Sequence, residues 1–284
     1  NNNVITASAA TTLNGEANLT FDGSTLTVNG AAVFNENSAD VDFRIESNNE
    51  ANAFVVNGGD DTVLIGTAVS DQTANITPRF QIEGTSKATA TMSLTRNSND
   101  VYGPHLVLNK TRGTAVNSDT IVQDDDFLGV IAFGAADGTD RNSQGAAIYA
   151  MVDGSPGSDD TPGRLIFLTT ADGASGPSER MTILSGGNVG IGTASPASPL
   201  DILTTLSSDT QTTPETVLTL GTKYSSTGAN GGAGTGPRIY FKIPDDETNP
   251  SGGASIEALK ESGDDSVSNT ALAFSISQND ETLD

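Results

Sequence analysis

Short runs in which hydrophobic and polar residues alternate, bounded by turn residues, make up most of the chain. In DFRIES (42–47), Phe43 and Ile45 alternate with charged residues, and a period of two is typical of a half-buried β-strand. HLVLNK (105–110), GVIAFGA (129–135), AAIYAMVDG (146–154) and RLIFLTT (164–170) are further short runs rich in β-forming residues, with loops of Gly, Asp, Ser and Pro between them. No stretch of ten or more residues has convincing helical periodicity. The pattern predicts an all-β fold.

Three hairpins are predicted where a tight turn separates two such runs. The turns are Asp22-Gly23-Ser24, Gly58-Gly59 and Gly186-Gly187. Asp-Gly or Gly-Gly between alternating strands is a strong hairpin signal, because tight turns need a positive φ that glycine adopts without strain. We expect glycine to supply that conformation in all three turns.

The glycines of GGNVGIGTASP (186–196) raise the alternative of a phosphate-binding loop. Such a loop requires a helix to begin directly after the glycines. Here Ser195-Pro196 and Pro199 follow instead, with no amphipathic helix. The stretch is therefore interpreted as the turn and return strand of a hairpin.

Internal repetition is the most informative feature of the sequence. VLIGT (63–67) returns as VGIGT (189–193), 126 positions later, and MSL (92–94) corresponds to LTL (218–220) at the same offset. Further along, the offset becomes 108, and residues 129–150 match residues 237–258. Ile131 then corresponds to Ile239, Phe133 to Phe241, Gly145 to Gly253 and Ile148 to Ile256; with one deletion, 164–170 matches 271–277. Conserved strands with varied loops predict two copies of one β-module.

The repeats divide the chain into three parts. Residues 1–85 are predicted as an N-terminal β-hairpin module, 86–200 as the first repeat and 201–284 as the second, incomplete at its C-terminal end. By the repeat, a strand equivalent to ERMTI (179–183) should follow residue 284. We therefore expect the sequence to be a fragment or a processed chain.

Composition and charge narrow the classes of function. The chain has 284 residues, a net charge of −23 from 36 acidic and 13 basic residues, and neither cysteine nor tryptophan. Disulfides, thiolate metal sites and cysteine nucleophiles are thus excluded. A chain this acidic repels nucleic acids and anionic membranes, and no apolar run is long enough for a membrane-spanning helix. We expect no nucleic-acid partner and no membrane insertion.

Candidate chemistry is sparse. His105, the one histidine, would have to serve any Ser-His-Asp arrangement, and no nucleophile motif accompanies it. Paired carboxylates could serve glycan hydrolysis, and acidic loops could hold calcium, but no EF-hand pattern is present. The acidic pairs are Asp60-Asp61, Asp124-Asp125, Asp159-Asp160 and Asp245-Asp246; Asn18, Asn75 and Asn109 head Asn-x-Ser/Thr triplets, interpreted as chance. We predict no catalytic, cofactor-binding or metal-binding residue.

Several motifs carry a resemblance to a known family. GEANLTFDGSTLTVNG (15–30), DTIVQDDDFLGVIAFGAADGTD (119–140) and PGRLIFLTTADGASGPSERMTILSGGNVGIGTASP (162–196) resemble tail-fibre and related virion proteins of tailed bacteriophages, in which ERM.I…GNVGIGT.SP repeats along a shaft. The resemblance implies a structural protein of the virion surface that supports host attachment, usually a homotrimer without an active site. It also implies other virion proteins as partners, and a host glycan or receptor bound through a distal region outside this chain. Many such fibres end in a self-cleaving intramolecular chaperone, which nothing in this sequence resembles.

The physics of the sequence independently favours an oligomer. Short strands with few large side chains bury too little to offset the entropy of ordering them, whereas symmetric association of identical chains covers their faces and edges. We therefore expect elongated tandem β-modules, built as hairpins and short-strand sandwiches or prisms, in an intertwined homotrimer. Phe133, Ile148, Phe167 and Phe241 are the predicted shared core, with Ile191 beside the interface because Gly190 leaves its face open to a neighbour.

Three other functions remain open at this point. A head fibre or capsid decoration protein belongs to the same structural class. A glycan-degrading tailspike would be an enzyme, and a bacterial surface adhesin would also use β-repeats. Acidic clefts lined by aromatic side chains would favour the enzyme.

Overall fold

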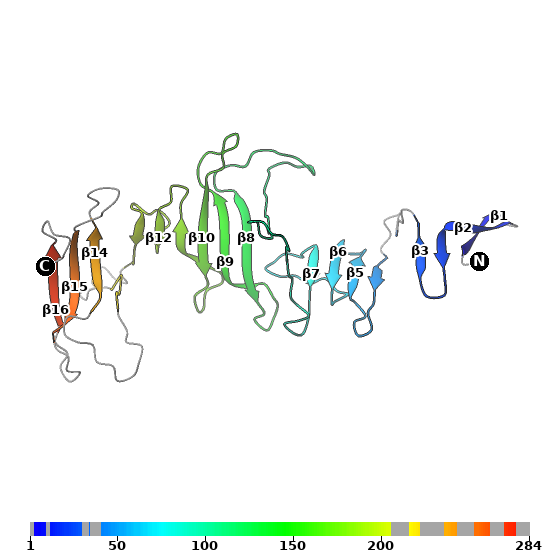
Figure 1. Cartoon of the computed structure of the whole chain (residues 1–284), viewed down its shortest axis with the longest axis horizontal. Coiled ribbons are helices and arrows are strands. Elements are labelled where there is room, and N and C mark those ends of the chain that lie inside the picture. The colour runs from blue at the N-terminus through cyan, green and yellow to red at the C-terminus, as the bar shows by residue number, and fades with distance from the viewer. Residues whose placement is uncertain are drawn as a thin grey trace. The chain divides into compact units, whose positions relative to one another are not determined.

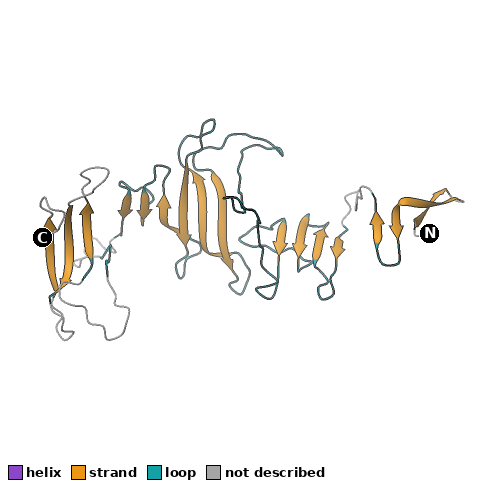
Figure 2. Cartoon of the chain, viewed as in Figure 1, coloured by secondary structure: helices purple, strands orange, loops and turns teal. Residues whose placement is uncertain are grey.

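The computed structural model contains strands, turns and loops but no helix in its described part (Figure 2). It describes residues 3–9, 12–29, 34, 41–205, 216–221, 236–242, 253–261 and 270–276. Over those residues the all-β prediction is confirmed, and no helix there is long and apolar enough to cross a membrane. The chain divides into two compact units, Asn1–Gly187 and Asn188–Asp284.

The first unit contains meandering sheets in which chain neighbours pair (Figure 1). One sheet has the order β1 (Asn3–Ala9), β2 (Thr12–Phe21) and β3 (Leu26–Val28); the next has β4 (Phe43–Ile45), β5 (Phe54–Asn57), β6 (Thr62–Ile65) and β7 (Phe80–Ile82). The longest strands follow as β8 (Phe127–Ala135), β9 (Ser143–Val152), β10 (Gly163–Thr169) and β11 (Ser178–Ile183). The second unit has the pair β12 (Val189–Ile191) and β13 (Leu200–Ile202), and the sheet β14 (Arg238–Lys242), β15 (Gly253–Lys260) and β16 (Thr270–Ile276).

The predicted turns are present, although glycine does not always supply the positive φ. Gly23 (φ 101°) and Gly187 (φ 87°) do so, and the Gly187 amide donates to the Leu184 carbonyl at 2.8 Å. In the turn between β5 and β6 the left-handed residue is Asp61 (φ 54°), so the prediction for Gly58-Gly59 was wrong in this respect. Gly58 is required there by space, because an added Cβ would lie 2.8 Å from the backbone of Val41.

The repeat of VLIGT and VGIGT corresponds to one local structure that occurs in both units. β6 pairs in parallel with β7, and β12 pairs in parallel with β13. The glycine after each first strand has a positive φ, 81° at Gly66 and 75° at Gly192. A Cβ there would lie 2.0 Å from the Glu83 carbonyl oxygen or 2.1 Å from that of Leu203. Because glycine has no Cβ, the backbone that follows β7 or β13 can lie directly against Gly66 or Gly192.

The match between residues 129–150 and 237–258 is confirmed by strand register. Ile131 of β8 lies opposite Ile148 of β9, and the equivalents Ile239 and Ile256 lie opposite each other in β14 and β15. The deletion in the third strand is also correct, because Ile148 pairs with Phe167 as Ile256 pairs with Phe274. Phe133 faces Ala146 as Phe241 faces Ala254. The apolar residues thus occupy the same face of both sheets.

Two sequence expectations are not met. HLVLNK (105–110) is not a strand, and no strand occurs between β7 and β8. The run is rich in β-forming residues, but no other segment of the described chain pairs with its backbone. In addition, every contact between the described strands within a unit joins neighbours in one sheet, so these strands do not form a β-sandwich in either unit.

Gly192→Ala tests the glycine that follows β12. The alanine must adopt a left-handed backbone, which costs about 1–2 kcal/mol, and its Cβ would displace the Leu203 carbonyl. We expect the Leu203 amide, which donates to the Ile191 carbonyl at 2.9 Å, to exchange with solvent more than tenfold faster. Gly186→Ala is the matched control, because nothing lies within 4 Å of that Cβ position. Equal exchange in the two variants would contradict this explanation.

Candidate functional site: an uncovered apolar face and its supports

The most prominent functional feature is an apolar face of the sheet formed by β8, β9 and β10. We define the apolar face by Ile131, Phe133, Ile148 and Phe167, which cross-strand pairing places on one side of the sheet. Phe133 is 54% exposed and Ile131 44%, while Ile148 and Phe167 are half-buried. The opposite face contains the buried residues Ala147 and Ile166. One face of the sheet thus has an apolar surface that its own chain leaves open.

The second unit repeats this arrangement. Ile239, Phe241 and Phe274 are 40%, 51% and 72% exposed, on the face equivalent to the first. Among the described residues, six apolar side chains are buried, whereas 35 large ones are exposed. Isolated exposed apolar residues are ordinary, but contiguous apolar patches mark interaction surfaces. Both repeats therefore present the same surface for a partner.

The predicted role of Gly190 needs correction. Gly190 is buried by its own chain, so its face is not open to a neighbour as the sequence had suggested. Ile191, on the alternate side of the strand, is 41% exposed and is available for contact.

Arginine–carboxylate pairs hold the loops around the β8–β11 sheet. Arg112 donates two hydrogen bonds to the Asp126 carboxylate, each 2.7 Å long. The Asp126 side chain is 13% exposed and also accepts the Gln123 amide at 2.9 Å. These bonds, above all those from Arg112, hold the pKa of Asp126 well below its ordinary value. The pair fixes the segment that leads into β8.

Arg164, on β10, joins two further carboxylates. It contacts Asp125 and, at 3.2 Å, Asp153. The pKa of Asp153 is lowered mainly by hydrogen bonds from Ser185, whose amide donates to the carboxylate at 2.8 Å, and secondarily by Arg164. Asp124 accepts the Gly154 amide at 2.7 Å. Asp124 and Asp125 thus act as structural acceptors that close the ends of β9 and β10.

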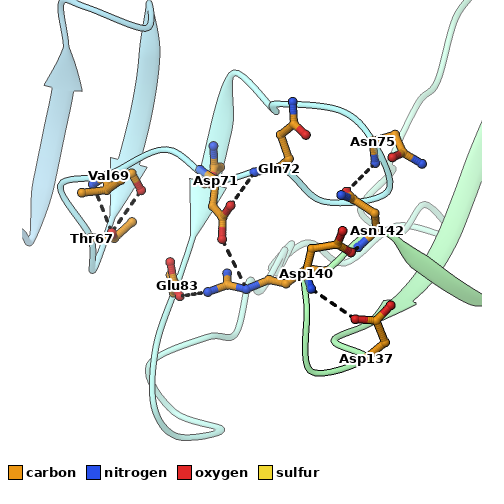
Figure 3. A network of polar contacts seen from close by, with 11 residues as sticks. Thr67, Val69, Asp71, Gln72, Asn75, Glu83, Asp137, Asp140 and Asn142 are labelled. Carbon is orange, nitrogen blue, oxygen red and sulfur yellow. Dashed lines mark hydrogen bonds and ion pairs between the residues drawn. The ribbon is translucent and has the colours of Figure 1, made fainter.

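A polar network joins the loop between β6 and β7 to the turn between β8 and β9 (Figure 3). Arg141 in that turn donates to Glu83 at 2.8 Å and lies 3.4 Å from Asp71. The Asn75 amide donates to the Asn142 side chain at 2.8 Å. Residues 58 to 70 positions apart in sequence are thereby held together. At Glu83, the network fixes the start of the long strandless segment between β7 and β8.

The hollow beside this network does not resemble a glycan-cleaving cleft. It has a volume of about 690 Å³ and is lined by Asp71, Gln72, Ala136 and residues 138–142. Asp71 is paired with Arg141, and Asp140 accepts the Asn142 amide at 2.8 Å. No aromatic side chain lines the hollow, whereas sugar-binding sites are commonly lined by aromatic rings.

The other residues considered from the sequence are scattered. His105 is exposed and forms no hydrogen bond or ion pair in the described chain. Asp60 accepts the Ser70 hydroxyl, Asp61 lies 3.8 Å from Arg79, and Asp159 and Asp160 lie in an exposed turn. Asn18 is in β2, Asn75 is in the polar network and Asn109 is exposed, while Asp245-Asp246 lies outside the described residues. Among the described residues, no group of three or more His, Asp or Glu side chains is placed to hold a metal ion.

The arginines that organise these loops were not predicted from the sequence. Each of the ion pairs found between described residues uses arginine. The signal available in the sequence was the scarcity of basic residues, since only 13 accompany 36 acidic ones. A lone arginine in an acidic loop, such as Arg141 in ADGTDRNSQG, therefore deserved to be considered as a bridging residue.

Comparison with known proteins gives weak likenesses. No protein-family model matches the chain, and no curated protein sequence matches it. Among solved structures, it is similar to the carboxy-terminal domain of the bacteriophage T5 L-shaped tail fibre, with 11% identity, a TM-score of 0.31, and coverage of 68% of this chain and 85% of that one. The same fibre domain with its intramolecular chaperone domain gives 12% identity and a TM-score of 0.32, with coverage of 66% and 56%. Overlaps this low establish neither a common fold nor a common function.

The Arg112–Asp126 pair predicts a dependence of stability on pH. Because the pKa of Asp126 is lower in the folded chain than its ordinary 3.8, the pair's contribution is complete above that value and is lost as the pH falls below it. Asp126→Asn should lower the urea midpoint at pH 7 and make its decline between pH 5 and pH 2 shallower.

Asp119→Asn is the control for this experiment, because Asp119 is exposed and forms no ion pair in the described chain. Its midpoint should follow that of the wild type at every pH. If Asp126→Asn behaved in the same way, the pair would have no role in stability.

Proposed function

We propose that this chain is a structural virion protein, a trimeric fibre shaft or shaft base that projects from a tailed phage and supports host attachment. The observation that carries the proposal is the repeated module, in which both copies keep one register and leave the same apolar face uncovered. Stacked modules of this kind give length, since each unit needs only its neighbours. The motif GNVGIGT.SP and its surroundings supply the link to phage fibres.

Association with identical chains buries the apolar face and thereby stabilises the fold of each copy. Burial of one large apolar side chain contributes about 1.5–3 kcal/mol, and the single-layered sheets bury few such side chains within a chain. Closure about a symmetry axis covers the same patch on every copy and leaves no patch free. Closure alone does not choose the number of copies, and the resemblance to fibres favours three.

The proposed role is non-enzymatic. His105 has no partner in the described chain, the aspartate pairs of that part are engaged in turns or with arginine, and the hollow at Arg141 lacks aromatic walls. The net charge of −23 suits a particle surface that must not adhere to nucleic acids or anionic membranes. Binding of a host glycan or receptor is assigned to a distal region outside this chain.

Particle labelling tests the location. Antibodies raised against the purified chain should label thin projections on phage particles whose genome encodes this sequence. Label on the tail supports the proposed fibre, and label on the capsid would assign the chain to a head fibre or decoration. Release of sugars from host polysaccharide by the purified chain, abolished by substitution of one carboxylate, would refute the structural role.

Phe133→Glu tests the role of the apolar face in assembly. The wild type should sediment at three times the 28.9 kDa of one chain, with an unfolding midpoint that rises with protein concentration. The substituted chain should associate about 10- to 100-fold more weakly, because it loses about 1.5–3 kcal/mol of burial per copy. Analytical ultracentrifugation measures both quantities.

Val116→Glu is the matched control, since Val116 is 92% exposed in a turn away from the strands. It should sediment as the wild type does. A stable wild-type monomer at micromolar concentration would contradict the assembly proposed here.

A further inference from the structure

Two runs of extended backbone lie in the strandless segment between β7 and β8. Residues 91–98 and 102–113 contain no turn, bend or strand, and a bend at 99–101 separates them. Figure 1 shows the whole segment as a long loop between the two sheets. Loops of this length in a compact domain are uncommon unless they have a function.

Both runs have the side-chain pattern of a strand. Met92 and Leu94 alternate with polar residues and are 59% and 51% exposed. In the second run Leu106, Val107 and Leu108 are 67%, 65% and 48% exposed. At these exposures their own chain leaves about half or more of each side chain uncovered.

The backbone of the runs is equally unpartnered. Between residues 90 and 111, no backbone amide or carbonyl takes part in a backbone–backbone hydrogen bond in the described chain. The few hydrogen bonds there involve side chains, such as that of Asp100, which accepts the Tyr102 amide at 3.0 Å. An extended, apolar, unpaired segment is a ready template for strand addition by another chain.

The same feature occurs in the second unit. Residues 216–221 are also without strand, turn or bend, and form no backbone–backbone hydrogen bond in the described chain. Leu218 and Leu220, the equivalents of Met92 and Leu94, are 58% and 45% exposed. Exposed, unpaired runs at corresponding places in two repeats indicate a property of the module.

Two observations identify the occupant as a second copy of this chain. The Leu108 side chain lies against Gly129 of β8, within 2.9 Å of where a Cβ would be, so the second run reaches the strand that carries Ile131 and Phe133 of the apolar face. Residues 102–110 also contain no acidic residue, and Lys110 is their one charged side chain, in a chain of net charge −23. A run without carboxylates can approach the acidic surface of another copy without like-charge repulsion.

We propose that residues 103–110 form a strand only on assembly, by backbone pairing with a second copy of the chain. The inference deepens the proposed function, since it names the segment through which copies associate. Pairing supplies the hydrogen bonds that the single chain lacks, and it covers Leu106 and Leu108 together with the apolar face. The strand predicted for HLVLNK would then exist in the assembly, although it is absent from one chain.

Hydrogen exchange of the purified full-length chain tests this directly. Amides of 103–110 should exchange at least 100-fold more slowly in the assembly than in a synthetic peptide of residues 99–115. The protection should disappear on dilution to monomer, whereas that of Leu64 in β6 should persist. An assembly in which this segment exchanges at the peptide rate would overturn the inference, as would protection that survives in the monomer.

Val107→Pro provides a second readout. Proline removes one amide donor, and the Val107 amide donates to nothing in the described single chain. We expect association at least tenfold weaker, with unchanged protection at Leu64. Val107→Ile keeps both the donor and the apolar side chain and should assemble normally. Equal assembly of the two variants would refute pairing through this run.

These outcomes separate the inference from the proposed function. A chain that assembles through 103–110 but is absent from phage particles would refute the virion role and leave the strand pairing intact. A labelled virion fibre whose 103–110 amides exchange freely would support the virion role and refute the strand pairing. A purified chain that stays monomeric with this segment unprotected would overturn the inference.

Discussion

Cross-strand packing of Ile131, Ile148 and Phe167 on one face of the β8–β10 sheet is the interaction on which the rest of the structure depends. Strand pairing aligns these residues, but none of the described strands forms a second layer over them. A β-sheet is stable when its apolar face is buried against another layer. In the proposed assembly another copy of the chain supplies that layer, and the ion pairs hold the loops around the sheet.

The two repeats show what this constraint preserves and what it leaves free to vary. Ile131–Ile148 and Ile239–Ile256 keep both residue type and register on the uncovered face. On the opposite face, the pair Val130–Tyr149 is replaced by Arg238–Glu257 at the same register. Glu257 is 6% exposed and also accepts the Ser255 hydroxyl, which, ahead of Arg238, lowers its pKa. An apolar pair and a hydrogen-bonded ion pair thus fill equivalent places, whereas the uncovered face stays apolar.

Arginine holds the irregular parts of an acidic chain in place. Arg112, Arg141 and Arg164 each bind carboxylates from segments that are distant in sequence. The planar guanidinium can bridge two acceptors at once, which suits a chain with few cations. Exposed pairs of this kind contribute little each, so their effect is to position loops around the sheets. The long segment between β7 and β8 is fixed at its ends by Arg141 and by Arg112, and its middle is left free to contact another chain.

The sequence by itself determined the fold class, the hairpin turns, the module repeats and even the single deletion in the third strand. These features follow from local pattern, because alternation and turn residues fix which face each side chain takes. The sequence did not determine that HLVLNK lacks a partner, that Gly190 is buried, or that Asp61 supplies the left-handed residue of its turn. Those were decided by tertiary structure. A strand exists only if another backbone forms hydrogen bonds with it, and a side chain is buried only if another segment packs against it. Neither condition can be deduced from the local sequence pattern.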